Sequence, residues 1–305
     1  MSVTFTEALD KAIGGDDGLM AGFCLERRTM AGPFLGPNAL MREERLTVTG
    51  SGDTDLITRR SMADASGEEI GEFHVTRPRD ITRGLLRAVK QSALERAPVF
   101  SIGPNDIRME VIVTVGDIAR GTTIGFTEPE VLQPLQPLLQ EMDRLAHEAR
   151  KRAVASLSLR LQAPEQTTQQ AETLQFTLLF QNTGSAGCWI THPSRQGDPT
   201  DAEHCLLSYG LTPRITPGIT PLPVEVETVG ALYSDLEAQN LLWVPPFGQA
   251  AFRFSASPHF ALPGAYLLRV SYASYQGGDR IEQNGKSQIR LRGCVFSNEV
   301  ELQVI

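Results

Sequence analysis

The feature that most constrains this chain is a change in sequence character near residue 152. Residues 138–152 (LLQEMDRLAHEARKR) read as a charged helix, and the residues before them mix helical and strand patterns. After them come short alternating runs broken by prolines and glycines. A chain of 305 residues is also at or above the size at which one hydrophobic core stops growing. We therefore predict two domains, residues 1–152 and residues 153–305.

Charge limits the kinds of partner that the chain can take. The net charge is −8 and divides evenly, with −4 on residues 1–152 (19 basic, 23 acidic) and −4 on residues 153–305 (9 basic, 13 acidic). Neither half has the basic excess with which a duplex nucleic-acid binder neutralises phosphates. We therefore expect no nucleic acid as a partner, and we also expect no cofactor.

The termini and the cysteines indicate a cellular compartment. The first residues (MSVTFTEALDK) lack the basic start and apolar centre of a signal peptide. No stretch approaches the roughly 20 apolar residues that a membrane helix needs. The four cysteines form no CxxC pair and are sparse for a disulfide framework; they are Cys24, Cys188, Cys205 and Cys294. We expect a cytoplasmic protein with thiols and no membrane partner.

The N-terminal half predicts an α+β domain. Residues 107–115 alternate apolar and polar side chains, which is typical of a strand with one buried face. Residues 81–96 repeat apolar side chains every four positions, which predicts a helix that Asp80 would cap. Further expected elements are a helix at 6–13, a strand at 18–30, a hairpin of 45–50 and 56–61, and strands at 69–75 and 120–126. This order predicts an antiparallel sheet with helices on one face.

Residues 40–145 resemble a known family. The segment has a hairpin, a helix, a strand like residues 107–115 and then PEVLQPLQPLL at 129–139. This order is similar to that of emfourin-type inhibitors of metalloproteases. The extra helix and strand at the N-terminus depart from the pattern of that family. The resemblance implies inhibition of a protease as a function.

The C-terminal half predicts an all-β sandwich. Nine short candidate strands lie at regular spacing within about 150 residues. The sequence LPGAY at 262–266 resembles the tyrosine corner of Greek-key sandwiches, and SNEVEL at 297–302 resembles a last strand of such folds. Residues 153–305 therefore resemble bacterial Ig-like and fibronectin-type modules. The resemblance implies a module that binds or spaces rather than one that catalyses.

The best candidate for a binding surface is the segment 272–286 (YASYQGGDRIEQNGK), read as a long loop. Tyr, Ser, Gly and Asn are the residue types that recognition loops favour, because rigid aromatic contacts stand beside adaptable polar ones. We expect Tyr272 and Tyr275 to be aromatic contacts there, with Asp279 and Arg280 setting charge specificity. An ordinary polar connection between strands is the alternative.

Two enzymatic alternatives depend on cysteine and histidine. Cys188, His192, His204 and Cys205 are zinc-type ligands within 18 residues, but neighbouring side chains in a strand point to opposite faces. The simpler prediction is two core cysteines and two surface histidines. Cys24 is a candidate nucleophile with His74, His147 or His259 as base, although no nucleophile motif surrounds it, and a small core residue is the simpler prediction. We expect no metal site and no catalytic residues.

A basic stripe on the predicted helix 81–96 has two interpretations. Arg83, Arg87 and Lys90 follow i, i+4, i+7 spacing, and Arg77 and Arg79 extend them. Such a stripe suits an acidic partner or single-stranded nucleic acid, but no aromatic side chains interleave to stack bases. A solvated helix face is the simpler interpretation, and the sequence leaves the function of the stripe open.

We therefore predict a non-enzymatic, intracellular bacterial protein that binds another protein, with inhibition or regulation of a protease as one form. Two alternatives stay open. One is a metal-dependent or hydrolytic enzyme with its site between the domains, and the other is a structural component of a larger assembly. The sequence names neither the partner nor the oligomeric state.

Overall fold

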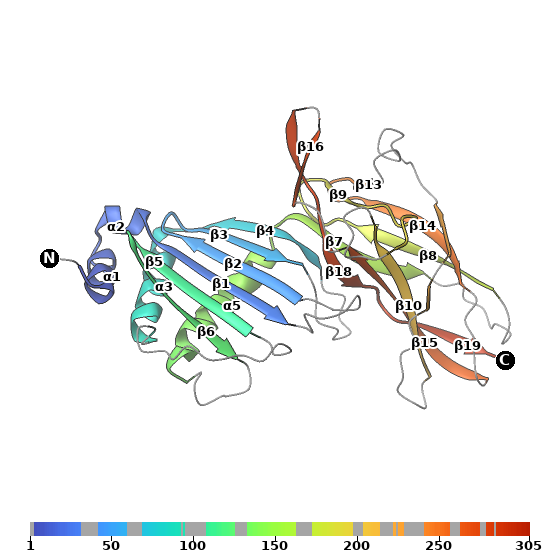
Figure 1. The fold of residues 1–305 in the computed structure, drawn as a ribbon, viewed down its shortest axis with the longest axis horizontal. Helices are drawn as coiled ribbons and strands as arrows, with labels where there is room; N and C mark the ends of the chain where they lie inside the picture. Colours follow the sequence, from blue (N-terminus) through green and yellow to red (C-terminus); the bar gives the residue numbers. More distant parts are fainter. Residues whose placement is uncertain are drawn as a thin grey trace. The chain divides into compact units, whose positions relative to one another are not determined.

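The computed structural model describes residues 3–31, 42–59, 69–92, 94, 108–125, 133–162, 173–197, 204–213, 222–223, 225–228, 241–256, 263–274, 279–283 and 285–305. These residues form mostly antiparallel β-sheets, with four α-helices among them (Figure 1). The chain divides into two compact units. Unit 1 comprises residues 1–58 and 72–154, and unit 2 comprises residues 59–71 and 155–305. The segment 59–71 is therefore part of the same unit as the C-terminal half.

Unit 1 is built on a sheet in the order β4-β3-β2-β1-β5-β6, with antiparallel pairing from β3 through β6. Its buried side chains alternate with exposed ones, as in β5, where Met109, Val111, Val113 and Val115 point into the core. The strands are β1 (Cys24–Ala31), β2 (Arg42–Thr49), β3 (Asp53–Thr58), β4 (Ile70–Thr76), β5 (Arg108–Val115) and β6 (Ile118–Gly125).

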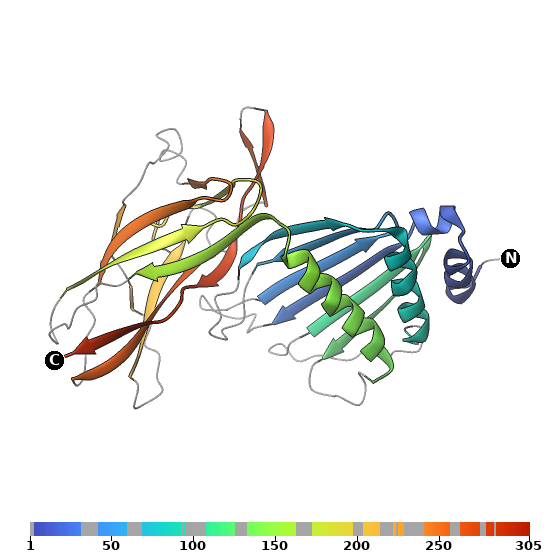
Figure 2. The same cartoon turned by 180° about the vertical axis from the view of Figure 1, so that it is seen from behind.

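The helices of unit 1 bury one face of this sheet. Helices α3 and α5 lie on the same side of the strands, as Figure 2 shows from behind. The helical elements are α1 (Phe5–Ile13), α2 (Asp17–Ala21), α3 (Arg79–Gln91), the 3₁₀ turn η2 (Gln133–Leu135) and α5 (Gln136–Arg150). One hydrophobic cluster joins α1, α3, α5 and the inner side chains of the strands. We call the other face of the sheet the open face; most of its described side chains are partly or fully exposed, as those of Glu110 and Ile112 are in β5.

Two of these helices differ from the sequence prediction. Residues 17–21 form α2 and not the start of a strand, because the Asp16 carboxylate accepts hydrogen bonds from the backbone N–H groups of Gly18 and Leu19, both at 3.0 Å. Helix α3 begins at Arg79, since the Pro78 carbonyl already accepts a hydrogen bond from the backbone N–H of Ile81. Asp80 therefore lies in the first turn and does not cap the helix.

Unit 2 contains two antiparallel sheets that share one core. One runs β12-β14-β8-β7, and the other runs β11-β10-β15-β18, with β19 also on β15. Their inner side chains belong to a single hydrophobic cluster. The strands are β7 (Ala153–Gln162), β8 (Leu174–Gln181), β9 (Cys188–Thr191), β10 (Leu206–Pro213), β11 (Leu222–Pro223), β12 (Glu225–Thr228), β13 (Leu241–Val244), β14 (Gln249–Ala256), β15 (Gly264–Ser274), β16 (Arg280–Gln283), β17 (Lys286–Ile289), β18 (Gly293–Phe296) and β19 (Val300–Val304).

The segment 272–286 is not one long loop. Strand β15 continues to Ser274, and β16 pairs with β17 in a separate two-stranded sheet. The dipeptide Asn284-Gly285 was the sequence signal for this hairpin, because Asn-Gly favours the left-handed backbone of a two-residue turn. Gly285 has the positive φ of +69° that such a turn requires.

In the described part of the chain, no helix is both long and apolar enough to cross a bilayer.

Candidate functional site

The hairpin of β16 and β17 is the candidate site. It forms a sheet of its own and extends beyond the other strands of unit 2 (Figure 1). A lone two-stranded hairpin is marginally stable in water at best. What holds it is therefore found at its base, where it joins the rest of unit 2.

Asp279 is the centre of that base. Its carboxylate accepts hydrogen bonds from Arg59, on one oxygen, and from Arg292, on the other at 2.6 Å. Burial raises the pKa of this carboxyl, but the hydrogen bonds and charges of Arg292 and Arg59 outweigh burial and leave the pKa below its ordinary value. Asp279 is therefore a carboxylate that ties together three parts of unit 2.

A close backbone contact fixes Arg59 at this position. The backbone N–H of Cys294 donates to the Arg59 carbonyl at 2.9 Å. Gly293 has a φ of +140°, and a Cβ at that position would lie 1.6 Å from the same carbonyl oxygen. Only glycine allows this approach. Gly293 therefore lets the backbone of Arg59 approach the start of β18 closely.

The second strand of the hairpin is attached to β9. Trp189 donates its indole N–H to the Gln288 side chain, and the backbone N–H of Leu291 donates to the Trp189 carbonyl at 2.9 Å. The backbone N–H of Arg290 donates to the Asp279 carbonyl at 3.0 Å, which closes the base between the strands. Hydrogen bonds therefore hold both strands of the hairpin, β16 and β17, at its base.

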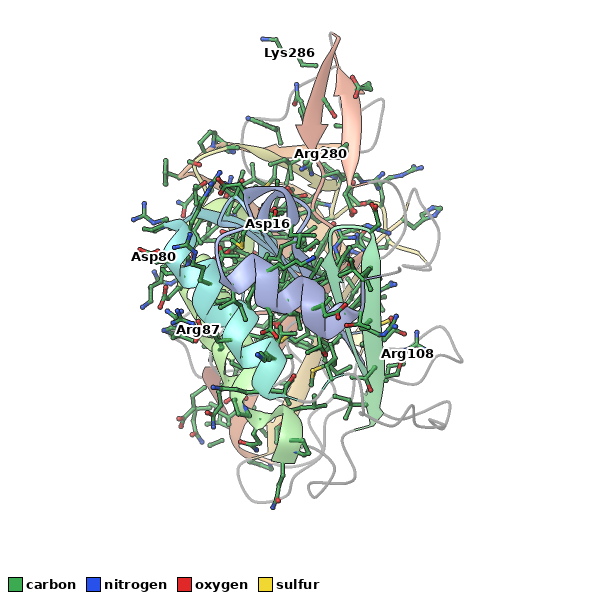
Figure 3. The ribbon with its side chains drawn as sticks, turned by 90° about the vertical axis from the view of Figure 1, so that its left-hand side faces the viewer. Asp16, Asp80, Arg87, Arg108, Arg280 and Lys286 are labelled. Atoms are coloured by element: carbon green, nitrogen blue, oxygen red, sulfur yellow. The ribbon has the colours of Figure 1, made fainter. Side chains whose placement is uncertain are left out.

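The hairpin presents charges of both signs to solvent along its length. Arg280, Glu282 and Lys286 are exposed. Figure 3 shows Arg280 near the base and Lys286 at the outer end, with its side chain directed away from the ribbon. A rigid base that carries an exposed, mixed-charge end is suited to contact with a protein surface of complementary charge.

The four residues predicted from the sequence have different places. Tyr272 is in β15 with no exposed surface, and its hydroxyl donates to the Thr191 carbonyl at 2.9 Å. It is thus part of the core of unit 2. Tyr275 lies outside the described residues. Asp279 is at the base of the hairpin, and Arg280 is exposed beside it, donating to the Asp279 carbonyl at 2.9 Å. Sequence reasoning missed Arg59, Arg292 and Trp189.

A second polar cluster lies on the open face of unit 1. Asp55 Oδ1 is 2.8 Å from His74 Nδ1, and His74 Nε2 is 3.2 Å from Thr76 Oγ1. This order of carboxylate, imidazole and hydroxyl is that of a hydrolytic triad. The Thr76 hydroxyl, however, donates its proton to Asp53 Oδ1 at 2.6 Å, and the cluster is exposed. The arrangement therefore does not give His74 a hydroxyl proton to abstract.

The four cysteines have different surroundings. Cys24 is half-buried on the open face, not in the core, and burial followed by the Glu26 charge raises the pKa of its thiol. Burial also raises the pKa of the Cys205 thiol to about 12. Cys188 and Cys205 are core residues, as predicted, but His192 is also buried, with its ring edge-on to Phe252. Among the described residues no set of three acidic, cysteine or histidine side chains could hold a metal ion.

The basic stripe on α3 is largely paired within unit 1. Arg79 pairs with Asp17, Arg83 with Asp80 and Lys90 with Asp10, while Arg77 is buried against Glu148. Arg87 is exposed and has no ion-pair partner in the part of the chain that the structure describes. A shallow pocket of about 430 Å³ lies beside the stripe, lined by Val75, Arg77, Ile81, Glu148, Lys151 and Arg152. Most of the stripe is thus already neutralised.

The comparisons with known proteins leave the site to be interpreted from its own geometry. No protein-family model matches the chain, and no curated protein matches it.

Proposed function

We propose that this chain binds another protein, and that the β16–β17 hairpin is the contact surface. The observation that carries the proposal is the base of the hairpin, where Asp279 takes hydrogen bonds from Arg59 and Arg292. An isolated two-stranded hairpin has marginal stability, but these hydrogen bonds hold the base of this one while its outer end stays exposed. Rigidity lowers the entropy lost on binding, which favours affinity.

The exposed charges of the hairpin support a protein as the partner. Arg280 and Lys286 are cations, and Glu282 between them is an anion. Mixed charges suit a protein surface that matches them one by one, whereas a nucleic acid presents negative phosphates throughout. Inhibition or regulation of a protease is the specific form that we propose, in line with the emfourin-like order of residues 40–145.

The same proposal includes the finer architecture and the compartment. We propose that unit 1, which contains most of residues 1–152, is an α+β domain and that unit 2, which contains residues 155–305 and the segment 59–71, is an Ig-like sandwich, a fold that commonly presents binding loops at its ends. The shared core of the two sheets supports the sandwich. The four cysteines are thiols, which supports a reducing compartment such as the cytoplasm.

Alanine variants of the exposed charges test this proposal. The triple variant Arg280→Ala, Glu282→Ala, Lys286→Ala removes the charges of the hairpin and leaves Asp279 in place. The matched control Arg83→Ala, Arg87→Ala, Lys90→Ala removes three cations from α3. Tagged versions of both, and of the original chain, are purified from native cells, and co-eluting proteins are quantified by mass spectrometry.

We expect the original chain and the α3 control to retain one protein in near-equal amount, and the hairpin variant to lose it. If the hairpin variant retains that protein and the α3 variant loses it, the contact surface is on α3 and not on the hairpin. Retention by both would refute the hairpin as the contact. A set of many proteins in fixed ratio would point to a larger assembly.

A further inference from the structure

The turn between β13 and β14 displays an aromatic side chain at an unfavourable position. Phe247 is 74% exposed, and its φ is +50°. It is the one residue other than glycine with a positive φ in the described part of the chain. Left-handed backbone costs an ordinary residue about 1–2 kcal/mol, and exposure forgoes the gain from burying a ring. The chain therefore keeps a residue here that does not serve its own stability.

The turn type explains the strain. The backbone N–H of Gly248 donates to the Pro245 carbonyl at 3.1 Å, so residues 245–248 form a β-turn. Proline at the second position and a positive φ at the third are the pattern of a type II turn, whose third position strongly favours glycine or asparagine. Phe247 occupies that third position, while the adjacent Gly248 lies outside it.

A neighbouring segment holds the turn without using the ring. The side-chain nitrogen of Asn182 donates to the carbonyls of Ala186 (2.9 Å) and Pro245 (3.1 Å), and its backbone N–H donates to the Gly248 carbonyl at 2.9 Å. The backbone N–H of Phe247 donates to the Gly184 carbonyl at 3.1 Å. Asn182 is itself buried. All these bonds use backbone or Asn182 atoms, so the ring is presented by a frame that does not need it.

We propose that Phe247 is a preformed anchor that enters an apolar pocket on a protein partner. Strained backbone that the surrounding structure over-determines is characteristic of ligand-contact sites. Aromatic side chains are enriched in the buried centre of protein interfaces. The frame holds the ring in place before binding, so little conformational entropy is lost when it docks.

The charges near the turn favour a protein over a lipid surface. Neither segment of the frame, 181–187 or 245–249, contains a lysine or an arginine. A charged side chain that contacts the frame is that of Glu69, which accepts a hydrogen bond from the Thr183 hydroxyl at 3.2 Å. Anionic headgroups would repel this carboxylate, since membrane surfaces attract basic segments. We infer a partner whose apolar pocket has a basic or uncharged polar rim.

The turn is connected to the candidate hairpin through the two tryptophans. Trp243, just before the turn, packs on Trp189 with ring centroids 4.7 Å apart, and Trp189 donates to Gln288 of β17. This inference therefore rests on the proposal that the chain binds a protein. It differs from that proposal in assigning the apolar contact to Phe247 and the charged contact to the hairpin.

A pair of variants separates the ring from the strain. Phe247→Ala removes the ring and keeps the strain, whereas Phe247→Gly removes both. We expect the melting temperature to be unchanged in the alanine variant and to rise by about 1–3 °C in the glycine variant. A fall of several degrees in both would mean that the ring serves the fold, which would overturn the inference.

Photo-crosslinking at the same position identifies what the ring contacts. A benzoylphenylalanine residue replaces Phe247 in the full chain in native cells, and a control replaces Ile112, another exposed apolar residue. We expect one protein adduct from position 247 that position 112 does not give. The unlabelled original chain should compete for that adduct at least about tenfold better than Phe247→Gly.

Four other outcomes would each decide against the inference, and a fifth would decide against the hairpin alone. A lipid adduct would assign the turn to a membrane, and an adduct with a second copy of this chain would assign it to self-association. Equal competition by the original chain and by Phe247→Gly would show that the ring contributes nothing. If the hairpin triple variant alone fails to compete, the proposed function stands and Phe247 is not its anchor. If it competes fully while Phe247→Gly fails, the turn is a contact and the hairpin is not.

Discussion

The carboxylates of Glu44 and Asp279 are each held by two arginines, and they differ in burial. Glu44 in unit 1 has a side chain only 6% exposed, and it accepts hydrogen bonds from Arg27 at 2.8 Å and from Arg150. Asp279 in unit 2 is 32% exposed and lies between Arg59 and Arg292. The chemistry of the two clusters is the same, but their surroundings are not.

The difference teaches what each cluster does. Glu44 connects β1 and β2 to α5, so it fixes a helix on the sheet inside a fold. Asp279 connects a distant segment and the start of β18 to a hairpin that faces solvent, so it fixes a projecting surface. A buried ion that loses its partner costs several kcal/mol, whereas exposed pairs contribute little. We therefore expect the Glu44 cluster to control the stability of the fold and the Asp279 cluster to control the orientation of the hairpin.

The largest expected effect is on the buried cluster. Glu44→Ala leaves Arg27 without its buried partner, and we expect a loss of about 3–5 kcal/mol in the free energy of unfolding. The control is Asp143→Ala, because Asp143 also contacts Arg27 but is 72% exposed and should cost less than about 1 kcal/mol. Urea denaturation of both variants measures the difference. Equal losses would show that burial does not set the contribution of Glu44 to stability.

The second effect is on the hairpin base. Asp279→Asn keeps the shape of the side chain and removes its charge, and we expect less than about 2 kcal/mol of lost global stability. Amide hydrogen exchange over residues 280–289 should become faster, because the base no longer fixes the strands. Exchange in unit 1 provides the internal control and should not change. Unaltered exchange in the hairpin would show that something other than Asp279 holds it.

The hairpin base should also respond to acid. Since the folded pKa of Asp279 is depressed, its stabilising contribution is full above the unfolded value of about 3.9 and is lost as pH falls through the folded value. The base should therefore stay intact from pH 7 to pH 5 and loosen below about pH 4. The indole N–H resonance of Trp189, which reports on Gln288, would follow this change. Asp279→Asn should abolish the pH dependence, and an identical profile in that variant would contradict the assignment.

The smallest effect is expected on the helix stripe. Arg87→Ala and Arg83→Ala should each change the free energy of unfolding by less than about 0.5 kcal/mol, because both side chains are at the surface and the Asp80 partner of Arg83 is 87% exposed. Thermal melts at low and high salt measure this. A change of more than about 1 kcal/mol in either variant would give the stripe a structural role comparable to that of the hairpin base.

Local patterns in the sequence predicted much of the fold. The alternation over residues 107–115 and the four-residue repeat of α3 gave the right elements, because both depend on side chains close together in the chain. Two elements were missed although the sequence held a local signal for each: Asn284-Gly285 for the β16–β17 hairpin and the Asp16 cap for the short helix α2.

The base of the candidate site had no such signal. Arg59 and Asp279 are 220 residues apart, and only the long-range packing of unit 2 brings them together. The strained Phe247 was equally hidden, since its sequence (PPFG) predicts a turn but not which residue takes the positive φ. Tyr272 was misplaced because residues 272–286 were interpreted as one loop, whereas β15 continues to Ser274 and buries Tyr272.

The most direct test of the central claim is hydrogen exchange of the chain alone and in the complex isolated from native cells, followed peptide by peptide with mass spectrometry. The account predicts added protection over residues 279–289 on binding, with little change over α3 (Arg79–Gln91). Protection confined to α3 or to the open face of unit 1, with none in the hairpin, would contradict it.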